Sequence, residues 1–206
     1  KSVNKAIKNI NSKISKELIG KDPLDQIYID NILLKLDNSE NKKNLGANAM
    51  LAVSLANFKA SALIKKKSLY KNFGKNFSLP RPLMNIINGG AHADNDLKIQ
   101  EFMIRPDSSE TFLDAVEKCF LVIEKLKKIL KSKNMLTNVG DEGGFAPAID
   151  SNEDCLNLIV DAISSAKLIP GKDINICLDV AANELINKEG KYSIQSNKFE
   201  TADEVI

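Results

Sequence analysis

LPRPLMNIINGG, residues 79–90, is the stretch at which the character of the sequence changes. Leu79-Pro80-Arg81-Pro82 cannot continue a helix, because proline has no amide donor and clashes with the preceding helical turn. Leu83–Ile87 is a short apolar run that ends in Asn88-Gly89-Gly90, a pattern typical of a buried strand followed by a turn. The stretch therefore predicts a domain boundary and, directly after it, a strand.

Residues 1–78, before this boundary, are predicted to be helical. Apolar residues recur at helical spacing at the start of the chain, at Val3, Ile7, Ile10, Ile14 and Leu18. A second helix is predicted to begin at Asp22, with Pro23 in its first turn. A third helix, over residues 45–64, is rich in alanine, and its small side chains would allow close packing against neighbouring helices.

Residues 79–206, after the boundary, alternate between strands and helices. Strands are predicted at Leu83–Ile87, Ile99–Ile104 and Ile174–Val180, with two helices between the second and the third. The apolar faces of these helices are Phe112, Val116, Cys119, Ile123, Leu126 and Leu130 in the first, and Leu156, Ile159, Val160 and Ile163 in the second. The order β-β-α-α-β predicts an α/β fold, the beginning of a barrel with helices outside.

Capping motifs predict two helix starts in this second part. Ser151-Asn152-Glu153-Asp154 opens the second barrel helix, and Thr201-Ala202-Asp203-Glu204 opens another helix close to Ile206. Because that helix would continue past the last residue, we expect the chain to be part of a longer protein.

Composition excludes several classes of protein. The 206 residues carry 29 basic and 27 acidic side chains, a balance that argues against a dedicated nucleic-acid binder. The longest apolar runs, such as Phe120–Ile123, are too short to span a membrane, and no signal peptide is recognisable. Three widely spaced cysteines without a CxxC pair are typical of reduced thiols in a cytoplasmic protein.

Asp179 is the first candidate site residue. In the third predicted strand, Ile174, Ile176, Leu178 and Val180 share one face, and Asn175, Cys177 and Asp179 share the other. If the apolar face packs against helices, Asp179 points inward at the carboxyl end of the strand, where barrels place metal ligands and catalytic groups. The alternative is an aspartate that caps a turn at the end of the strand.

The loop between the first two strands holds the only histidine, His92. A hairpin would bring the end of strand one and the start of strand two to the same rim, so His92, Gln100 and Glu101 would gather there. The neighbouring glycines would let an anionic ligand approach closely. The alternative is a solvated loop histidine.

A second loop, Val139-Gly140-Asp141-Glu142-Gly143-Gly144-Phe145-Ala146-Pro147, places two adjacent acids among three glycines. It lacks the Gly-Lys-Ser/Thr ending of a phosphate-binding loop, and its acids would repel phosphate. An acid poised for proton transfer is the functional interpretation, and a plain turn is the alternative.

Five segments, read in order, resemble the enolase family. They are residues 44–49 (NLGANA), 84–95 (MNIINGGAHADN), 100–104 (QEFMI), 139–144 (VGDEGG) and 178–182 (LDVAA). The form His92-Ala93-Asp94-Asn95 resembles bacterial members. The resemblance covers essentially the whole chain, and it implies that residues 1–78 are the helical part of a small α+β amino-terminal domain. Residues 79–206 would then be the first strands of the family's β-β-α-α barrel.

The resemblance also implies roles for the candidate residues. Glu142 resembles the acid that protonates a departing hydroxyl, and Glu101 the carboxylate that works beside it and contacts substrate. His92 and Gln100 resemble substrate-contacting residues, and Asp179 a ligand of a tightly held Mg²⁺. The implied reaction is the reversible dehydration of 2-phosphoglycerate to phosphoenolpyruvate in glycolysis and gluconeogenesis, by a cytoplasmic homodimer or larger homo-oligomer.

These residue types suit that chemistry. Removing a proton next to a carboxylate requires neutralisation of the resulting charge, and sites of the enolase superfamily use a Lys or His base with one or two Mg²⁺ ions. Mg²⁺ prefers oxygen ligands, as Asp179 would supply. Expelling hydroxide needs a protonated acid, and two neighbouring glutamates favour one of them keeping its proton.

The resemblance further implies that the general-base lysine and two more acidic metal ligands would lie beyond Ile206. We therefore expect the chain alone to be inactive. The alternative function is a non-catalytic fragment or interaction module from a broken gene, and the flanking coding sequence would discriminate the two. A secondary pool that binds a host protein at the cell surface is a third hypothesis, which no residue of this stretch supports specifically.

Overall fold

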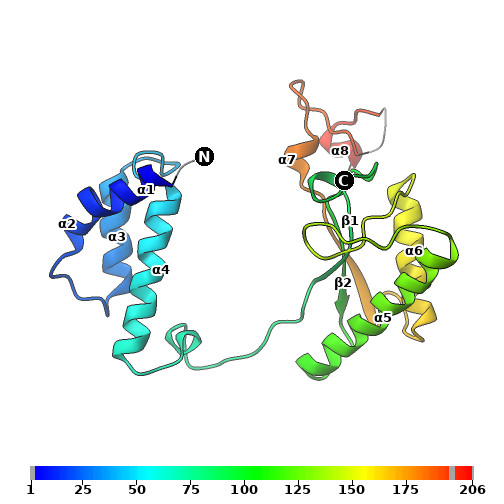
Figure 1. Cartoon of the computed structure of the whole chain (residues 1–206), viewed down its shortest axis with the longest axis horizontal. Helices are drawn as coiled ribbons and strands as arrows, with labels where there is room; N and C mark the ends of the chain where they lie inside the picture. The colour runs from blue at the N-terminus through cyan, green and yellow to red at the C-terminus, as the bar shows by residue number, and fades with distance from the viewer. Residues whose placement is uncertain (1–2, 195–197, 206) are drawn as a thin grey trace. The chain divides into compact units, whose positions relative to one another are not determined.

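The computed structural model describes residues 3–194 and 198–205 and divides into two compact units, Lys1–Ser78 and Leu79–Ile206. Within the described residues of the first unit, every regular element is helical (Figure 1). In chain order these elements are α1 (Asn4–Asn9), the π-helical turn η1 (Ile10–Ile14), α2 (Ser15–Leu18), α3 (Gln26–Asp37), α4 (Ala47–Ile64) and the 3₁₀ turn η2 (Leu69–Asn72).

The predicted start of the second helix was wrong by four residues. The Oδ1 atom of Asp22 accepts a hydrogen bond from the Leu24 amide at 2.9 Å, which makes residues 22–24 a turn. Asp25 is the N-cap instead, and its side chain accepts from the Tyr28 amide at 2.9 Å. Pro23 therefore lies before α3 and not in its first turn.

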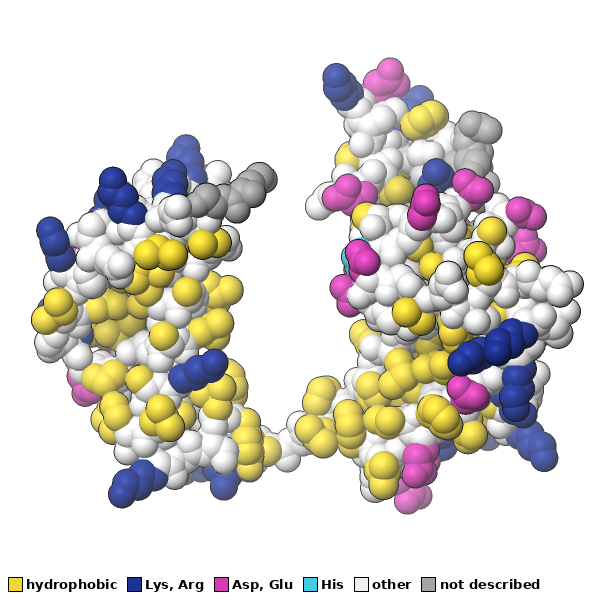
Figure 2. Space-filling view, viewed as in Figure 1, with side chains coloured by type: hydrophobic (Ala, Val, Ile, Leu, Met, Phe, Trp, Pro, Cys, Tyr) yellow, Lys and Arg dark blue, Asp and Glu magenta, His cyan; other side chains and the backbone are white. Residues whose placement is uncertain are grey.

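α4 packs by its small and sulfur-containing side chains. Ala49, Met50, Ser61 and Ala62 are buried, and a small core joins Ala49 and Met50 to Ile14, Leu33 and Leu45. Among the described residues, α4 is the only helix long and apolar enough to cross a membrane by length and composition alone. Figure 2 shows hydrophobic side chains gathered on the visible face of this unit, and Leu51, Leu55 and Leu63 of α4 are more than half exposed.

The second unit combines three strands with helices. Its elements are β1 (Met84–Asn88), the 3₁₀ turn η3 (Gly90–His92), β2 (Glu101–Pro106), α5 (Phe112–Ser132), α6 (Asn152–Ser165), β3 (Ile174–Asp179), α7 (Ala182–Leu185) and α8 (Ala202–Val205). The predicted order of strands and helices is confirmed. Both capping boxes are confirmed as helix starts, because Ser151 Oγ accepts from the Asp154 amide and Glu204 accepts from the Thr201 amide.

The three strands form one antiparallel sheet in the order β1-β2-β3. A bulge between Asn85 and Ile87 shifts the register of β1 against β2. The free edge of β1 is covered by Phe145, whose amide donates to the Ile86 carbonyl at 2.9 Å and whose carbonyl accepts from the Asn88 amide at 2.8 Å. A loop far along the chain is thereby fixed to the strand that leads into the histidine turn.

One side of the sheet packs on α5 and α6. The core contains Phe102, Ile104 and Ile174 from the strands. The helices contribute Cys119, Val122, Leu126, Leu130, Cys155, Leu158, Ile159, Ala162 and Ile163. The predicted apolar faces of α5 and α6 each include one residue that is exposed, since Phe112 is 43% and Val160 is 38% exposed. Leu178 is also 41% exposed, so the predicted apolar face of β3 is buried only toward its beginning.

Asp107, directly after β2, joins the sheet to the segment that precedes β1. Arg105 donates to both carboxylate oxygens, at 2.7 Å from Nε and 2.8 Å from a terminal nitrogen. Asn175 also donates to this carboxylate, and Arg81 donates to the Asp107 main-chain carbonyl. The hydrogen bonds from Arg105, assisted by Asn175 and Arg81, lower the pKa of Asp107 to about 2.

We expect Asp107→Asn to lower the free energy of unfolding at pH 7 by roughly 1 kcal/mol, a value discounted because both arginines are about half exposed. Because the folded pKa lies below the unfolded one, this stabilisation is present above about pH 4 and lost as pH falls toward 2. Urea titrations at pH 7 and pH 2.5 measure it, with the exposed Asp161→Asn as control. An equal effect at both pH values would contradict the assignment.

Candidate active site

A row of three polar residues crosses the sheet at one rim. Glu101, the first residue of β2, is the register partner of Asn88 at the end of β1 and of Asp179 at the end of β3. Residues directly opposite each other in antiparallel strands project from the same face of the sheet. The antiparallel order thus gathers the end of β1, the start of β2 and the end of β3 at one place.

The histidine is held above this row by a short turn. After β1, Gly89 leads into η3, which begins at Gly90, and the His92 amide donates to the Gly89 carbonyl at 3.0 Å. Gly89 and Gly90 in turn donate to the carbonyls of Gln100 and Leu97, at 2.9 and 2.8 Å. A Cβ atom on Gly89 would overlap the Ile99 carbonyl oxygen, so only glycine permits this close approach.

The acidic loop is a small hairpin with Glu142 at its tip. The Gly140 amide donates to the Gly144 carbonyl at 2.8 Å, and the Ala146 amide to the Asn138 carbonyl at 2.8 Å. Gly143 turns the chain with a φ of +83°, in the left-handed region that favours glycine. The backbone of this loop is therefore a turn, as the alternative interpretation predicted. Whether the turn also has a functional role depends on the position of the Glu142 side chain.

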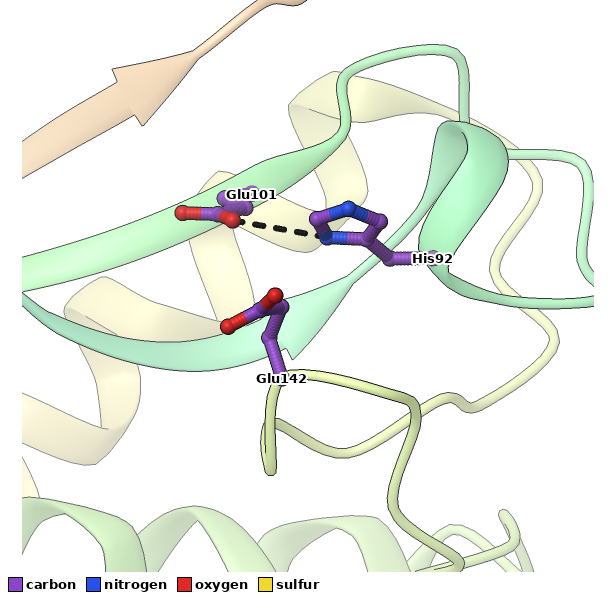
Figure 3. A group of neighbouring side chains, drawn as sticks. All are labelled: His92, Glu101 and Glu142. Carbon is purple, nitrogen blue, oxygen red and sulfur yellow. Dashed lines mark ion pairs between the residues drawn. The ribbon is translucent and has the colours of Figure 1, made fainter. Parts of the chain in front are cut away.

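In Figure 3, the Glu142 side chain points toward the side chains of His92 and Glu101. One ligand atom from each of the three residues lies within 4.8 Å of the other two. His92 Nδ1 is 3.4 Å from a carboxylate oxygen of Glu101, a close approach whose geometry does not make a hydrogen bond. Three segments that are separate in the sequence thus contribute one titratable group each to a single cluster.

Asn88, the register partner of Glu101, is fully buried. Its Oδ1 accepts from Asn85 Nδ2, and its carbonyl accepts from Asn95 Nδ2 at 3.0 Å. Within the described residues, its own Nδ2 has no acceptor. A buried donor of this kind costs about 1–3 kcal/mol, so its retention requires an explanation.

Asp179 stands at the same rim but outside the cluster of three. Its carboxylate is exposed, and Oδ1 accepts from the Ala181 amide at 3.0 Å. The turn-capping alternative is therefore also realised, and Ala181 adopts a left-handed φ of +49° beyond it. This bond engages one of the two carboxylate oxygens, and carboxylate oxygen at an open rim suits a hard cation such as Mg²⁺. The donor present thus fits the implied metal.

Gln100 is brought to the rim by its backbone. Its amide donates to the Asp179 carbonyl at 3.1 Å, which extends the pairing of β2 with β3 by one residue. Its side chain lines a shallow depression together with residues 181–184, at the start of α7. Gln100 thus lies at the same rim as Glu101 and Asp179.

Both units of this chain match families of known proteins. Residues 1–73 match the family described as "Enolase, N-terminal domain", and residues 76–205 match "Enolase, C-terminal TIM barrel domain". The chain belongs to the enolase family. It is 56% identical over 208 residues to a curated protein named enolase from Pelagibacter ubique (strain HTCC1062). That match covers 100% of this chain and 50% of the relative, so the chain spans about half the length of this enolase.

Sequence reasoning did not identify Asn88 as more than a turn residue. The signal that could have identified it is its position, a polar residue that ends an apolar strand and precedes two glycines. The contact of Asn88 with Gly140 and Gly144 joins segments more than fifty residues apart, and no local pattern reveals such a contact. In this enolase-family chain, the residues that form the cluster were predictable, but the residue that packs against the Glu142 hairpin was not.

Proposed function

We propose that this chain carries part of the active site of an enzyme that dehydrates 2-phosphoglycerate to phosphoenolpyruvate. The observation that supports the proposal best is the convergence of His92, Glu101 and Glu142 within 4.8 Å at the rim of the sheet. The membership of the chain in the enolase family supplies the reaction. The alternative of a non-catalytic interaction module has no comparable observation in its favour.

Glu142 is the general acid in this proposal. It projects from the tip of a hairpin that glycines hold at Gly140, Gly143 and Gly144, and its carboxyl group is exposed to an incoming ligand. Expelling hydroxide from carbon requires a proton at the leaving oxygen, and a carboxylic acid within hydrogen-bond reach can deliver it. Glu101, on a rigid strand beside it, contacts the substrate and orients this proton transfer.

His92 and Gln100 are substrate contacts in this proposal. His92 Nδ1 faces Glu101, so the other ring nitrogen is the atom available to a ligand. Gln100 can donate from its side-chain amide at the adjoining depression. Both side chains can donate hydrogen bonds, which suits a substrate that carries anionic oxygen atoms.

Asp179 would hold Mg²⁺ through its carboxylate oxygens, and carboxylate is the ligand type that this ion selects. Mg²⁺, when bound, supplies positive charge next to the substrate carboxylate, where the loss of a proton creates negative charge. The general base and the other metal carboxylates would come from the part of the relatives' length that this chain does not span. A cytoplasmic homodimer or larger homo-oligomer completes the proposal.

The test is a chimeric enzyme in which this chain replaces the half of the Pelagibacter enolase that it matches. We expect the purified chimera to form phosphoenolpyruvate from 2-phosphoglycerate with excess Mg²⁺. Removal of Mg²⁺ with EDTA should abolish this turnover, and re-addition should restore it. The chain Lys1–Ile206 assayed alone should show none, because it spans only about half the length of the Pelagibacter enolase.

The chimera also separates the two functional hypotheses. A folded chimera, with a cooperative thermal melt like that of the Pelagibacter enolase, but without turnover would reject the enzymatic proposal. The melt is needed because a chimera that fails to fold would also lack activity. If the chimera does not fold, a second chimera is made in which only residues 79–206 replace the matching part of the Pelagibacter enolase. The site residues are then tested in a host that keeps its own first domain.

A further inference from the structure

We propose that Asn88 is a positioning residue, which holds the hairpin of residues 138–146 so that Glu142 faces His92 and Glu101. The inference rests on the proposed function and deepens it. The Asn88 side chain accepts from Asn85 and makes no hydrogen bond with His92, Glu101 or Glu142. It acts through the backbone of the loop that carries Glu142.

The packing of Asn88 against two glycines carries this inference. A Cβ atom on Gly140 would overlap Asn88 Nδ2, and a Cβ atom on Gly144 would lie 2.9 Å from Asn88 Oδ1. Gly140 and Gly144 are also the two residues whose hydrogen bond closes the hairpin below Glu142. The amide group of Asn88 therefore fills the space between strand β1 and both ends of the turn.

The backbone of Asn88 joins the same parts. Its amide donates to the carbonyl of Phe145, a residue of the hairpin, at 2.8 Å, and its carbonyl accepts from Asn95 Nδ2. On the other side, Asn88 is the register partner of Glu101. The Asp141 amide donates to the His92 carbonyl at 3.3 Å, so the hairpin and the histidine turn also contact each other. One buried residue thus connects the segments that carry all three members of the cluster.

The orientation of the Asn88 side chain is itself fixed. Asn85 donates to Oδ1, which leaves Nδ2 turned toward Gly140 without an acceptor among the described residues. Stability alone does not favour a buried amide with an unsatisfied donor. Its shape, a flat polar group that fits between two glycine backbones, suits the task of fixing the hairpin.

The test uses the chimeric enzyme with Asn88→Ala, Glu142→Gln and the double variant. A misplacement of about 1 Å at a reacting group can cost roughly 10²-fold in rate, so we expect Asn88→Ala to lower kcat about 10-fold or more. KM for 2-phosphoglycerate should change less. On the Glu142→Gln background, the same substitution should cost less than about 3-fold, because residues that act through one another are not additive.

An activity-independent measurement accompanies the kinetics. Hydrogen exchange of the peptide that covers residues 138–147 should accelerate about 10-fold or more in Asn88→Ala, because its hydrogen bonds open more readily. Exchange in α5 should stay unchanged. The matched control is Asn152→Ala, which removes a partly buried asparagine whose side chain bonds the Ile194 carbonyl instead of packing against the hairpin. This control should change neither kcat nor exchange in the hairpin.

The outcomes separate this inference from the proposed function. If the folded chimera is inactive, the proposed function fails, and the exchange measurement alone decides the role of Asn88. An equal loss of kcat on both backgrounds, or unchanged exchange in the hairpin, would overturn the inference. Asn88→Ser keeps an oxygen that can accept from Asn85, so it should retain more activity than Asn88→Ala. If Asn88→Ala does not fold, Asn88→Ser is used in its place.

Discussion

Glu142→Gln in the chimeric enzyme is expected to lower kcat by roughly 10²-fold or more, as for the loss of a general acid. Glutamine matches glutamate in size but cannot release a proton to a leaving hydroxyl. Because the hairpin is held by the backbone of Gly140, Gly144 and Phe145, the substitution should leave the loop in place. KM for 2-phosphoglycerate and the affinity for Mg²⁺ should therefore stay close to their original values.

Steady-state kinetics of the purified variant measure this effect, and calorimetry checks that Mg²⁺ still binds. The control is Glu117→Gln, which removes an exposed glutamate from α5. A kcat within about 3-fold of the unmodified chimera would show that Glu142 does not transfer the proton. The same loss in both variants would point to a change in stability instead.

The elements of the fold were predictable where local patterns are strong. A short apolar run predicted β1, a period-2 repeat predicted β3, and period-3.6 repeats of apolar residues predicted α5 and α6. The capping boxes predicted the starts of α6 and α8, because the bonds that satisfy the first amides are made within four residues. At Asp22, an Asx turn and a true N-cap three residues later share the same preferred residue type, and the pattern did not separate them.

The candidate site was predictable only in part, for a related reason. His92 and Glu101 follow from the hairpin of β1 and β2, whose register brings the two strand ends together. Glu142 comes from a loop about fifty residues away, and its approach depends on the pairing of Phe145 with the edge of β1. Glycines at three positions, with Asn88 between two of them, permit that approach. Such packing is set by tertiary contacts, which composition and spacing do not encode.

Asp179→Ala in the chimeric enzyme is expected to weaken Mg²⁺ binding by about 10²-fold or more, because one of few anionic oxygen ligands is lost. Turnover at low Mg²⁺ should fall with it, and added Mg²⁺ should restore turnover in part. The Asp179 carboxylate also accepts from the Ala181 amide, so its removal loosens a turn as well. Asp179→Asn distinguishes the two effects, since an amide oxygen can still accept that bond but carries no charge.

Calorimetric titration with Mg²⁺ measures the affinities of both variants and of the control Asp161→Ala, which removes an exposed aspartate from α6. If Asp179 is a metal ligand, Asp179→Asn should lose most of the affinity that Asp179→Ala loses, while the control keeps it. If Asp179 only caps the turn, Asp179→Asn should bind Mg²⁺ as the unmodified chimera does. In that case the carboxylate at the rim has a structural role, and the ion is held by other residues.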